Sequence, residues 1–586
     1  MRILFEDQTY SPDLLKAWGL EAFMFTGRDG RDAMLPYVGY VHSSKINDSI
    51  FILPKVFLFQ GTGNIDQKNS KPEIAFGKYG IEDVMEISQE RNILKQDGLD
   101  RVLFGLSTWI YRAIDKYSAR HSHSDIIRRS SIQGVASHSG DSDSTLLDTI
   151  LALLDFSKEH SNLFTYITII NSTGKDKIHW AKTISKVQPV IQDEEPYYTA
   201  FRCKNKAVNY DEQLIILYYS VLQYLNRQYF FPVRTNFNYD LIKPSRIESL
   251  IESGRGTRLL RSIRRRYFKD ELVRLWKLLY AFFDKSESIR SGKTRDEALL
   301  ARSFNLVFEE MVDSIIGNEN KDKDEDVILS RLKDNKDGKR IDHIYKDRSM
   351  LDDGQIYYIG DSKYYFYGSD IGPESIYKQF TYAKNIIQLN IDIFNKEEQR
   401  RSPEEKAVIR GIRYRDQLTE GYNPTPNFFV RGYIHPDDLT EGHADYGNDR
   451  LKRFRRQDIP INSHFPGRPF DRDTLVLTAY NINFLFVLAS YVNTADNDNI
   501  RTRIHDCFRK DLIRVYNEKY DFFKVTPLKD DIPTFVRRYF QEYIGRMYHP
   551  ERAGFIWFAF DKGSENITTL CTSLGVDVLI EPAQLV

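Results

Sequence analysis

The order of apolar patterns that starts at residue 295 constrains the fold more than any other feature of this 586-residue chain. A helix pattern over 295–316 precedes a charged loop, two strand-like runs at 340–345 and 355–367, and a second helix pattern over 373–390. A further strand run, FFVRGYI, follows at 428–434. This alternation of strands and long amphipathic helices predicts an α/β unit.

The regions on either side of this unit have a different composition. Residues 1–205 contain short runs rich in Val, Ile, Phe and Tyr, such as MLPYVGYV and SIFILPKVFLF, and are predicted to be β-rich. Within them, residues 118–145 are dense in Ser, His and Asp and are predicted to be a flexible connection. Residues 206–298 show helical periodicity and are predicted to connect the two parts. With 299–500 as the α/β core and 501–586 as a small α/β extension, we expect a mixed α/β, multidomain protein.

Charge and cysteine content narrow the class of protein. The 83 basic and 83 acidic residues balance, which excludes a globally basic nucleic-acid binder but leaves room for local basic faces. Three widely separated cysteines favour a reducing compartment over a disulfide framework. Glu6 and Asp7 stand where a signal peptide needs apolar residues, and no apolar run reaches the ~20 residues that span a membrane. We therefore expect a soluble, cytoplasmic protein without a membrane partner.

Three residues on the two strand runs form the candidate catalytic group. Asp342 lies in RIDHIY, and Asp361 and Lys363 lie in IYYIGDSKYYFY. Because residues two apart on a strand face the same side, Asp361 and Lys363 are predicted to project together, with Ser362 turned away. Two carboxylates can hold a hard cation such as Mg²⁺. An amine beside them can orient water and stabilise negative charge, so this set suits hydrolysis of a phosphodiester.

The neighbourhood of Asp361 and Lys363 makes this group specific. Other Asp/Glu-x-Lys triplets occur in the chain, but only this one lies in an apolar strand with a second acid upstream. The preceding helix carries Glu309 and Glu310 as further candidate metal ligands. The following helix carries Gln379 and Tyr382 one turn apart on one face. The alternative is a β-hairpin with a surface salt bridge.

These residues resemble the PD-(D/E)xK nuclease superfamily, in which a helix-flanked sheet carries two acids and a lysine. The resemblance implies that Asp342 is the first acid, Asp361 the second acid and Lys363 the lysine. It also implies that Gln379 and Tyr382 are the helical Gln–Tyr pair, and that Glu309 or Glu310 is the acid of the preceding helix. The proline before the first acid is replaced by Ile341, and the Gln–Tyr spacing is three residues where four is frequent.

A broader resemblance extends to the N-terminal half. The run VGYVHSSKINDSIFILPKVFL, an irregular stretch from Trp180 to Cys203 and the late core together resemble LlaJI-type restriction endonuclease components. Those components are similar to McrC, the nuclease subunit of McrBC. The resemblance implies an N-terminal region that docks on a partner NTPase of the AAA+ class, a GTPase or an ATPase. The sequence GKT at 292–294 lacks the glycine of a phosphate loop, since Glu287 stands in its place, so any motor is another chain.

Two basic clusters are candidate DNA contacts. The first has Arg258, Arg261 and Arg265 at helical spacing, and the second, after the core, has Arg453, Arg455 and Arg456. Each could neutralise backbone phosphates, or form a solvated face or a protein contact. A histidine pair, His121 and His123, could touch a metal, but a solvated loop is favoured. His343 is expected to point away from Asp342 and is left out of the site.

The sequence predicts a DNA endonuclease subunit of a bacterial restriction or anti-phage system, dependent on Mg²⁺ or Mn²⁺. It would cut double-stranded DNA together with an AAA+ partner, and a double-strand break needs two sites, so we expect a dimer or a larger assembly. Two alternatives remain open. The chain could be a stand-alone restriction nuclease that recognises DNA itself. It could also be a non-catalytic adaptor that activates a partner NTPase.

Overall fold

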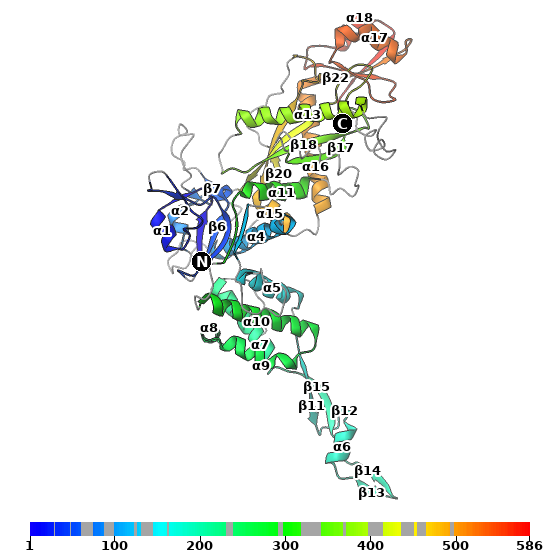
Figure 1. Cartoon of the computed structure of the whole chain (residues 1–586). Helices are drawn as coiled ribbons and strands as arrows, with labels where there is room; N and C mark the ends of the chain where they lie inside the picture. The colour runs from blue at the N-terminus through cyan, green and yellow to red at the C-terminus, as the bar shows by residue number, and fades with distance from the viewer. Residues whose placement is uncertain are drawn as a thin grey trace.

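The computed structural model describes most of the chain, namely residues 1–27, 30–46, 48–59, 74–86, 99–121, 126–130, 145–160, 163–229, 238–290, 297–317, 341–366, 371–396, 414–434, 451–453, 465–492 and 497–585. The molecule is elongated (Figure 1). An N-terminal sheet and a central sheet lie next to each other, a C-terminal unit extends from the central sheet, and a helical body carries a projecting arm at the opposite end (Figure 1). The observed structure is mixed α/β with several sheets.

The N-terminal sheet combines four strands from the first 130 residues with one strand, β16, that follows the helical body in the chain. Its order is β1 (Arg2–Phe5), β6 (Asp48–Leu53), β5 (Val38–Ser43), β16 (Glu297–Ala301) and β10 (Ile127–Ser130). Short elements complete this part: β2 (Thr9–Tyr10), α1 (Pro12–Ala17), β3 (Phe25–Thr26), β4 (Ala33–Met34), the 3₁₀ turn η1 (Lys55–Phe57), β7 (Leu58–Phe59), β8 (Ile74–Ala75), β9 (Tyr79–Gly80) and α2 (Ile81–Val84). The helical body and the arm therefore lie between β10 and β16 in the chain.

Strand β16 corrects the helix predicted over residues 295–316. Residues Glu297–Ala301 are a fully buried strand, and the helix α11 begins only at Phe304 and ends at Ile316. A short apolar run such as EALLA cannot be told from a buried helix by periodicity alone. Strand pairing decides the outcome, because Gly39 (φ 142°) of β5 brings its backbone so close that a Cβ there would lie 2.2 Å from the Leu299 carbonyl oxygen. The boundary expected between residues 298 and 299 falls inside this strand.

Helix α4 (Leu99–Arg120) joins the N-terminal sheet to the central sheet. It contacts β5, β6 and β16 on one side and α11 and α15 (Phe484–Val492) on the other. The segment 118–145, predicted to be a flexible connection, contains the last turn of α4 and the strand β10. The rest of that segment, apart from residues 121, 126 and 145, lies outside the described residues.

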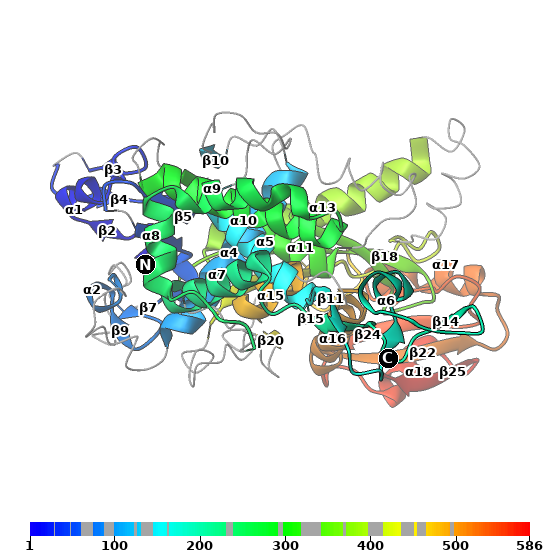
Figure 2. The same cartoon turned by 90° about the horizontal axis from the view of Figure 1, so that it is seen from below.

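Five helices form the helical body, and Figure 2 shows several of them side by side. They are α5 (Leu146–Glu159), α7 (Gln213–Tyr229), α8 (Pro244–Glu252), α9 (Arg255–Ile263) and α10 (Asp270–Arg290). Thr145 begins α5 with a capping box, in which its hydroxyl accepts from the Asp148 amide and the Asp148 carboxylate accepts from the Thr145 amide. The helical periodicity predicted for this region is confirmed.

The arm projects from the helical body between α5 and α7 (Figure 1). It contains a small sheet of β11 (Tyr166–Asn171), β15 (Cys203–Val208) and β12 (Lys177–Ile178), the helix α6 (Trp180–Lys186), and a hairpin of β13 (Val190–Gln192) and β14 (Glu195–Tyr197). The stretch from Trp180 to Cys203, predicted to be irregular, is therefore largely regular. Asp193 and Glu194 have φ values of 50° and 68° and make the two-residue turn that closes the hairpin.

The central sheet has the order β17 (His343–Arg348), β18 (Gln355–Lys363), β19 (Pro426–Tyr433), β21 (Val476–Asn483) and β20 (Leu451–Arg453). Strands β18, β19 and β21 are parallel, and β17 and β20 are antiparallel edge strands. Helices α11 and α13 (Pro373–Lys396) contact β18. The predicted succession of helix, two strands, helix and strand is confirmed for the described residues.

The C-terminal unit is attached to the central sheet by a shared core. It contains α16 (Asn497–Lys519), β22 (Tyr520–Pro527), α17 (Ile532–Tyr543), β23 (Met547–Tyr548), β24 (Ile556–Asp561), α18 (Ile567–Leu574) and β25 (Val578–Ala583). Its sheet has the order β23-β24-β22-β25. The Trp557 indole donates to the Leu351 carbonyl at 2.9 Å, within a buried cluster that also includes Val476 and Tyr516. Among the described helices of the whole chain, none combines the length and the apolarity that a membrane crossing requires.

Candidate active site

Strand β18 presents Asp361 and Lys363 on one face, as the two-residue period predicts. Their side chains form an ion pair, in which Asp361 is 4% exposed, and the Lys363 ammonium lies 5.3 Å from the centre of the Phe429 ring on β19. Ser362 points to the opposite face, where its hydroxyl meets Nε2 of His343 at 2.6 Å. His343 therefore lies on the face opposite Asp361, as expected, and its Nδ1 lies 3.3 Å from the Asp313 carboxylate. The paired carboxylate and ring hold the Lys363 ammonium in place.

Asp342 reaches the same edge of the sheet from a different local structure than predicted. It lies in a bend directly before β17, which begins at His343, and not inside the strand. Its Oδ2 accepts a hydrogen bond from the Ser362 amide at 2.9 Å. The carboxylate thus takes the place of a strand carbonyl as the acceptor for this amide. The pairing of β17 with β18 ends at His343 and Gly360, because beyond this pair the Asp342 side chain, and not its backbone, contacts β18.

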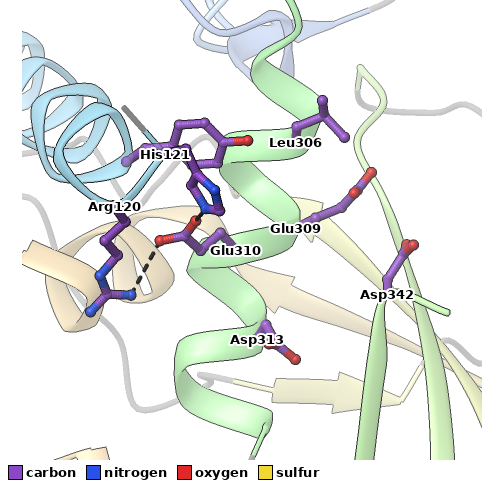
Figure 3. A pocket seen from close by; sticks show the side chains of 8 residues that line it. Arg120, His121, Leu306, Glu309, Glu310, Asp313 and Asp342 are labelled. Carbon is purple, nitrogen blue, oxygen red and sulfur yellow. Dashed lines mark hydrogen bonds and ion pairs between the residues drawn. The ribbon is translucent and has the colours of Figure 1, made fainter. Parts of the chain in front are cut away.

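Helix α11 separates the two neighbouring glutamates. Glu309 points towards Asp342, and Glu310 points to the opposite wall (Figure 3). Glu310 accepts from Nη1 of Arg120 at 3.2 Å, lies 2.5 Å from Nε2 of His121 and accepts from the Tyr491 hydroxyl at 2.6 Å. The structure thus brings Glu309 towards the acids and pairs Glu310 with Arg120, His121 and Tyr491.

Charge repulsion marks the acids as a group. Burial, and next the charge of Asp342, raise the pKa of Glu309 to about 7. Burial and the charge of Asp342 also raise the pKa of Asp361, against the opposing effect of Lys363. Carboxylates that raise each other's pKa in this way are suited to bind a divalent cation, whose positive charge would offset their negative charges. Within the described part of the chain, no three His, Cys, Asp or Glu side chains already stand at metal-binding distances.

A cavity of about 410 Å³ lies between α4 and the acids. It is lined by Tyr117, Arg120, His121, Leu306, Glu309, Glu310, Asp313 and Asp342. The sequence did not point to Tyr117, Arg120 or Asp313, because α4 is far from the core in the chain and no local motif marks it. The sequence marks His121 only as half of a pair with His123, which lies outside the described residues.

Helix α13 carries Gln379 and Tyr382, both 1% exposed. Neither end of the Gln379 amide has a hydrogen-bond partner among the described residues. The Tyr382 ring lies 5.6 Å from the ammonium of Lys378, a residue that the sequence did not single out. Burial would lower the pKa of Lys378, but Tyr382, Asp361 and Asp342 raise it above its usual value. The charge of Lys378 therefore interacts with those of the two aspartates, while no hydrogen bond joins Gln379 to Lys363.

The predicted basic clusters belong to other parts of the molecule. Arg258 and Arg261 lie on α9 of the helical body, whereas Arg265 lies in the 3₁₀ turn η2 (Arg264–Arg266) that follows. Arg261 donates to the Tyr280 hydroxyl at 3.0 Å, and Arg258 and Arg265 are exposed. Arg453 ends β20, and Arg455 and Arg456 lie outside the described residues, as does the GKT sequence.

Comparison with known families classifies the chain. The model of the LlaJI restriction endonuclease family matches residues 37–406, well over half of the sequence. The chain belongs to the LlaJI restriction endonuclease family. Membership makes this LlaJI-family protein a restriction nuclease that acts on DNA. A comparison with curated proteins gives no match.

The LlaJI match includes most of the residues described above. It covers part of the N-terminal sheet, α4, the helical body, the arm, and the central sheet as far as α13. Asp342, Asp361, Lys363 and Glu309 all lie within it, and so do Arg120 and His121. Strands β19, β20 and β21 and the C-terminal unit follow the matched residues. Both walls of the cavity therefore belong to the LlaJI-family part of the chain.

Proposed function

We propose that this LlaJI-family protein is a metal-dependent DNA endonuclease with a PD-(D/E)xK-type core, acting in bacterial restriction or anti-phage defence. The observation that carries the proposal is the meeting of Asp342, Asp361 and Lys363 at one edge of the central sheet. Glu309 faces them from α11 and shares their charge repulsion. A surface salt bridge in a hairpin would not gather further acids around a buried carboxylate.

Asp342, Asp361 and Glu309 are the residues that would hold Mg²⁺ or Mn²⁺, since their carboxylate oxygens suit a hard cation. Such an ion polarises a phosphate and neutralises the charge that develops on it. Lys363 orients the attacking water and offsets the same charge from the protein side, with its ammonium restrained by Asp361 and by the Phe429 ring. Lys378 adds a second positive charge near the two aspartates.

Gln379 and Tyr382 support this site from α13 and steady Lys363 or a backbone phosphate. The support for Gln379 is its buried amide, whose two ends lack partners within the described residues. An unmatched buried amide costs about 1–3 kcal/mol, and a hydrogen bond to Lys363 or to the substrate would offset that cost.

Glu310 is not assigned as a metal ligand. It was a candidate metal ligand together with Glu309, but its carboxylate is engaged by Arg120, His121 and Tyr491. A carboxylate that already has three partners is a weak candidate for a metal that must displace them. We therefore assign the acid of the preceding helix to Glu309 alone.

Cleavage of supercoiled and linear DNA with Mg²⁺ or Mn²⁺ tests the proposal. Wild type should cut, and Asp361→Ala and Lys363→Ala should not. Lys562→Ala is a matched control, because Lys562 also forms an ion pair with an aspartate, Asp521, at 2.7 Å, but in the C-terminal unit. Cutting by both active-site variants at the wild-type rate would refute the assignment. If wild type is inert with and without its partner, the adaptor alternative gains instead.

A partner NTPase of the AAA+ class, a GTPase or an ATPase, is the second part of the proposal. The arm supports it, because large apolar side chains stand exposed there: Tyr166 at 61%, Trp180 at 54%, Ile184 at 60% and Ile191 at 73%. Trp180 and Ile184 are four residues apart on α6 and so share a helix face, and an exposed apolar face on a projecting element is suited to a protein contact. Two chains are expected in the active assembly, since a double-strand break needs two sites.

Arm variants separate the subunit from the stand-alone nuclease. Trp180→Ala with Ile184→Ala should abolish stimulation of the partner's NTP turnover. Phe268→Ala is a matched control, because Phe268 is 87% exposed on the helical body and outside the arm. Sequence-specific binding and full cleavage by the isolated chain would favour the stand-alone nuclease. Stimulation that persists in Lys363→Ala without any metal-dependent cleavage by wild type would favour the adaptor.

A further inference from the structure

We propose that Arg120 and His121, at the C-terminal end of α4, bind a backbone phosphate of the DNA and form the second wall of the nuclease cleft. The inference rests on the proposed function and extends it to a residue pair outside the central sheet. The two residues line the same cavity as Glu309 and Asp342 (Figure 3). The cleft would thus be composite, with acids from the core and hydrogen-bond donors, one of them the Arg120 guanidinium, from the N-terminal part.

The end of α4 is held against the core by several contacts. The Lys116 ammonium donates to the Tyr491 carbonyl at 2.6 Å. The Tyr491 hydroxyl donates to Glu310, and the Arg120 guanidinium lies 5.7 Å from the centre of the Tyr491 ring. These contacts join α4, α11 and α15, so Arg120 has a defined position relative to the acids. A position that is set before the substrate arrives reduces the entropic cost of binding.

Arg120 and His121 remain accessible although they are paired. Their side chains are 49% and 45% exposed, whereas that of Glu310 is 16% exposed. The one hydrogen bond that the described residues make to the Arg120 guanidinium uses Nη1, and a guanidinium has five donors. Donors therefore remain for a phosphate, and Arg is well suited to bind one through two parallel hydrogen bonds.

Charge balance explains why the cleft needs such a wall. Four carboxylates line the cavity, those of Glu309, Glu310, Asp313 and Asp342. A DNA backbone that approaches them is repelled until cations compensate for their charge. Arg120 and His121 supply positive or donor groups on the opposite wall of the same cavity. Glu310 orients both groups through contacts to one nitrogen of each, and the other donors of Arg120 can bind a phosphate without displacing Glu310.

If Arg120 had a purely structural role, its replacement would have a different effect. Cations at a helix C-terminus interact favourably with the helix dipole, and a half-exposed ion pair contributes little to stability. In that case, replacement of Arg120 would lower the melting temperature slightly and leave DNA affinity unchanged. Removal of a phosphate-binding cation changes affinity and its salt dependence instead, because fewer counterions leave the DNA when the protein binds.

The test measures binding of a short DNA duplex over a range of salt concentrations, with the full-length protein and Ca²⁺ in place of Mg²⁺. Arg120→Ala with His121→Ala should weaken binding about tenfold and reduce the slope of log K against log salt by about 0.9 for each phosphate that is no longer neutralised. Arg120→Lys should retain part of the affinity. Arg112→Ala is the matched control, since Arg112 lies on the same helix but pairs with Asp155 at 2.8 Å and does not line the cavity.

Unchanged affinity and slope in the double variant would overturn the inference. Glu310→Gln should tighten binding two- to threefold, because it frees Arg120 and His121, and an unchanged affinity in this variant counts against the inference. Cleavage by wild type but not by Asp361→Ala, measured in parallel, keeps this outcome separate from the proposed function. If Asp361→Ala cuts as well as wild type does, the proposed function fails, whatever Arg120 does.

Discussion

The N-terminal sheet contains a buried glutamate and the proposed nuclease cleft a partly buried one, and the two differ in what surrounds the carboxylate. Glu297 lies in β16 and Glu309 in α11, which follow each other in the chain. Burial is the largest cause in both cases, and it raises the pKa of each carboxyl to about 7. By their pKa values alone, the two residues look equivalent.

Their partners separate them. Glu297 accepts from the Leu146 amide with both oxygens, at 3.1 and 2.9 Å, at the start of α5. Glu309 has only the Asn305 side-chain amide, at 3.4 Å, among the described residues, and the charges of Asp342 and Asp361 raise its pKa further. A buried carboxylate that binds a backbone amide is structural, whereas one that faces other carboxylates leaves negative charge for a cation to balance. The surrounding groups, more than the pKa itself, point to function.

The largest expected difference between the N-terminal sheet and the proposed cleft is the effect of substitutions on the rate of DNA cleavage. Asp361→Ala and Lys363→Ala should each lower the cleavage rate by about 10²–10³-fold, since each removes a group that stabilises transition-state charge. Glu297→Gln should cut at close to the wild-type rate, because the amide oxygen can still accept from Leu146. The measurement is single-turnover cleavage of a linear duplex. Equal losses in Glu297→Gln and Asp361→Ala would erase the distinction.

The dependence of stability on pH and Mg²⁺ should give the next largest effect. A pKa raised from 4.5 to about 7 means that the folded state binds more protons than the unfolded chain in this window, so stability falls as the pH rises through it. Mg²⁺ should restore part of this loss above pH 7 through Glu309, but not through Glu297. We expect Mg²⁺ to raise the melting temperature at pH 8 by about 2 °C. The rise should vanish in Glu309→Gln and persist in Glu297→Gln, and the opposite pattern would contradict the comparison.

Gln379 provides a sharper test, because function and stability should change in opposite directions. Gln379→Leu removes a buried amide that lacks partners among the described residues, so the protein should become more stable by up to about 1 kcal/mol. Cleavage should fall about tenfold if the amide steadies Lys363 or a phosphate. Thermal melting and single-turnover cleavage measure the two effects. A stable variant with full activity would make Gln379 a packing residue.

The smallest effects are expected from the basic clusters outside the cleft. Replacement of Arg453, Arg455 and Arg456 by Ala should weaken DNA binding at low salt about threefold to tenfold, because the protein then neutralises fewer phosphates. Replacement of Arg258 and Arg265 should have a smaller effect, because these exposed residues lie on the helical body. Filter binding at several salt concentrations measures both. An unchanged affinity would remove the respective cluster from the DNA footprint.

Local periodicity made part of the site predictable. Asp361 and Lys363 share a face because strand side chains alternate, and Gln379 and Tyr382 share one because they are a helical turn apart. The same reasoning failed for residues 297–301, where EALLA suits a buried strand and a buried helix equally well. It also placed Asp342 inside a strand, although a side-chain contact to the Ser362 amide ends the ladder before that residue.

By itself, the sequence determined the strand that carries Asp361 and Lys363 and the helix that carries Glu309, because those preferences depend on neighbours within a few residues. Only the tertiary structure decided between Glu309 and Glu310, since the packing of α11 against α4 turns one towards Asp342 and the other towards Arg120. It also brought Arg120 and His121 to the cleft from a helix almost two hundred residues earlier in the chain. The physical reason is that β16 joins the N-terminal sheet and thereby places α4 beside α11. Such long-range pairing leaves no periodic trace in either segment.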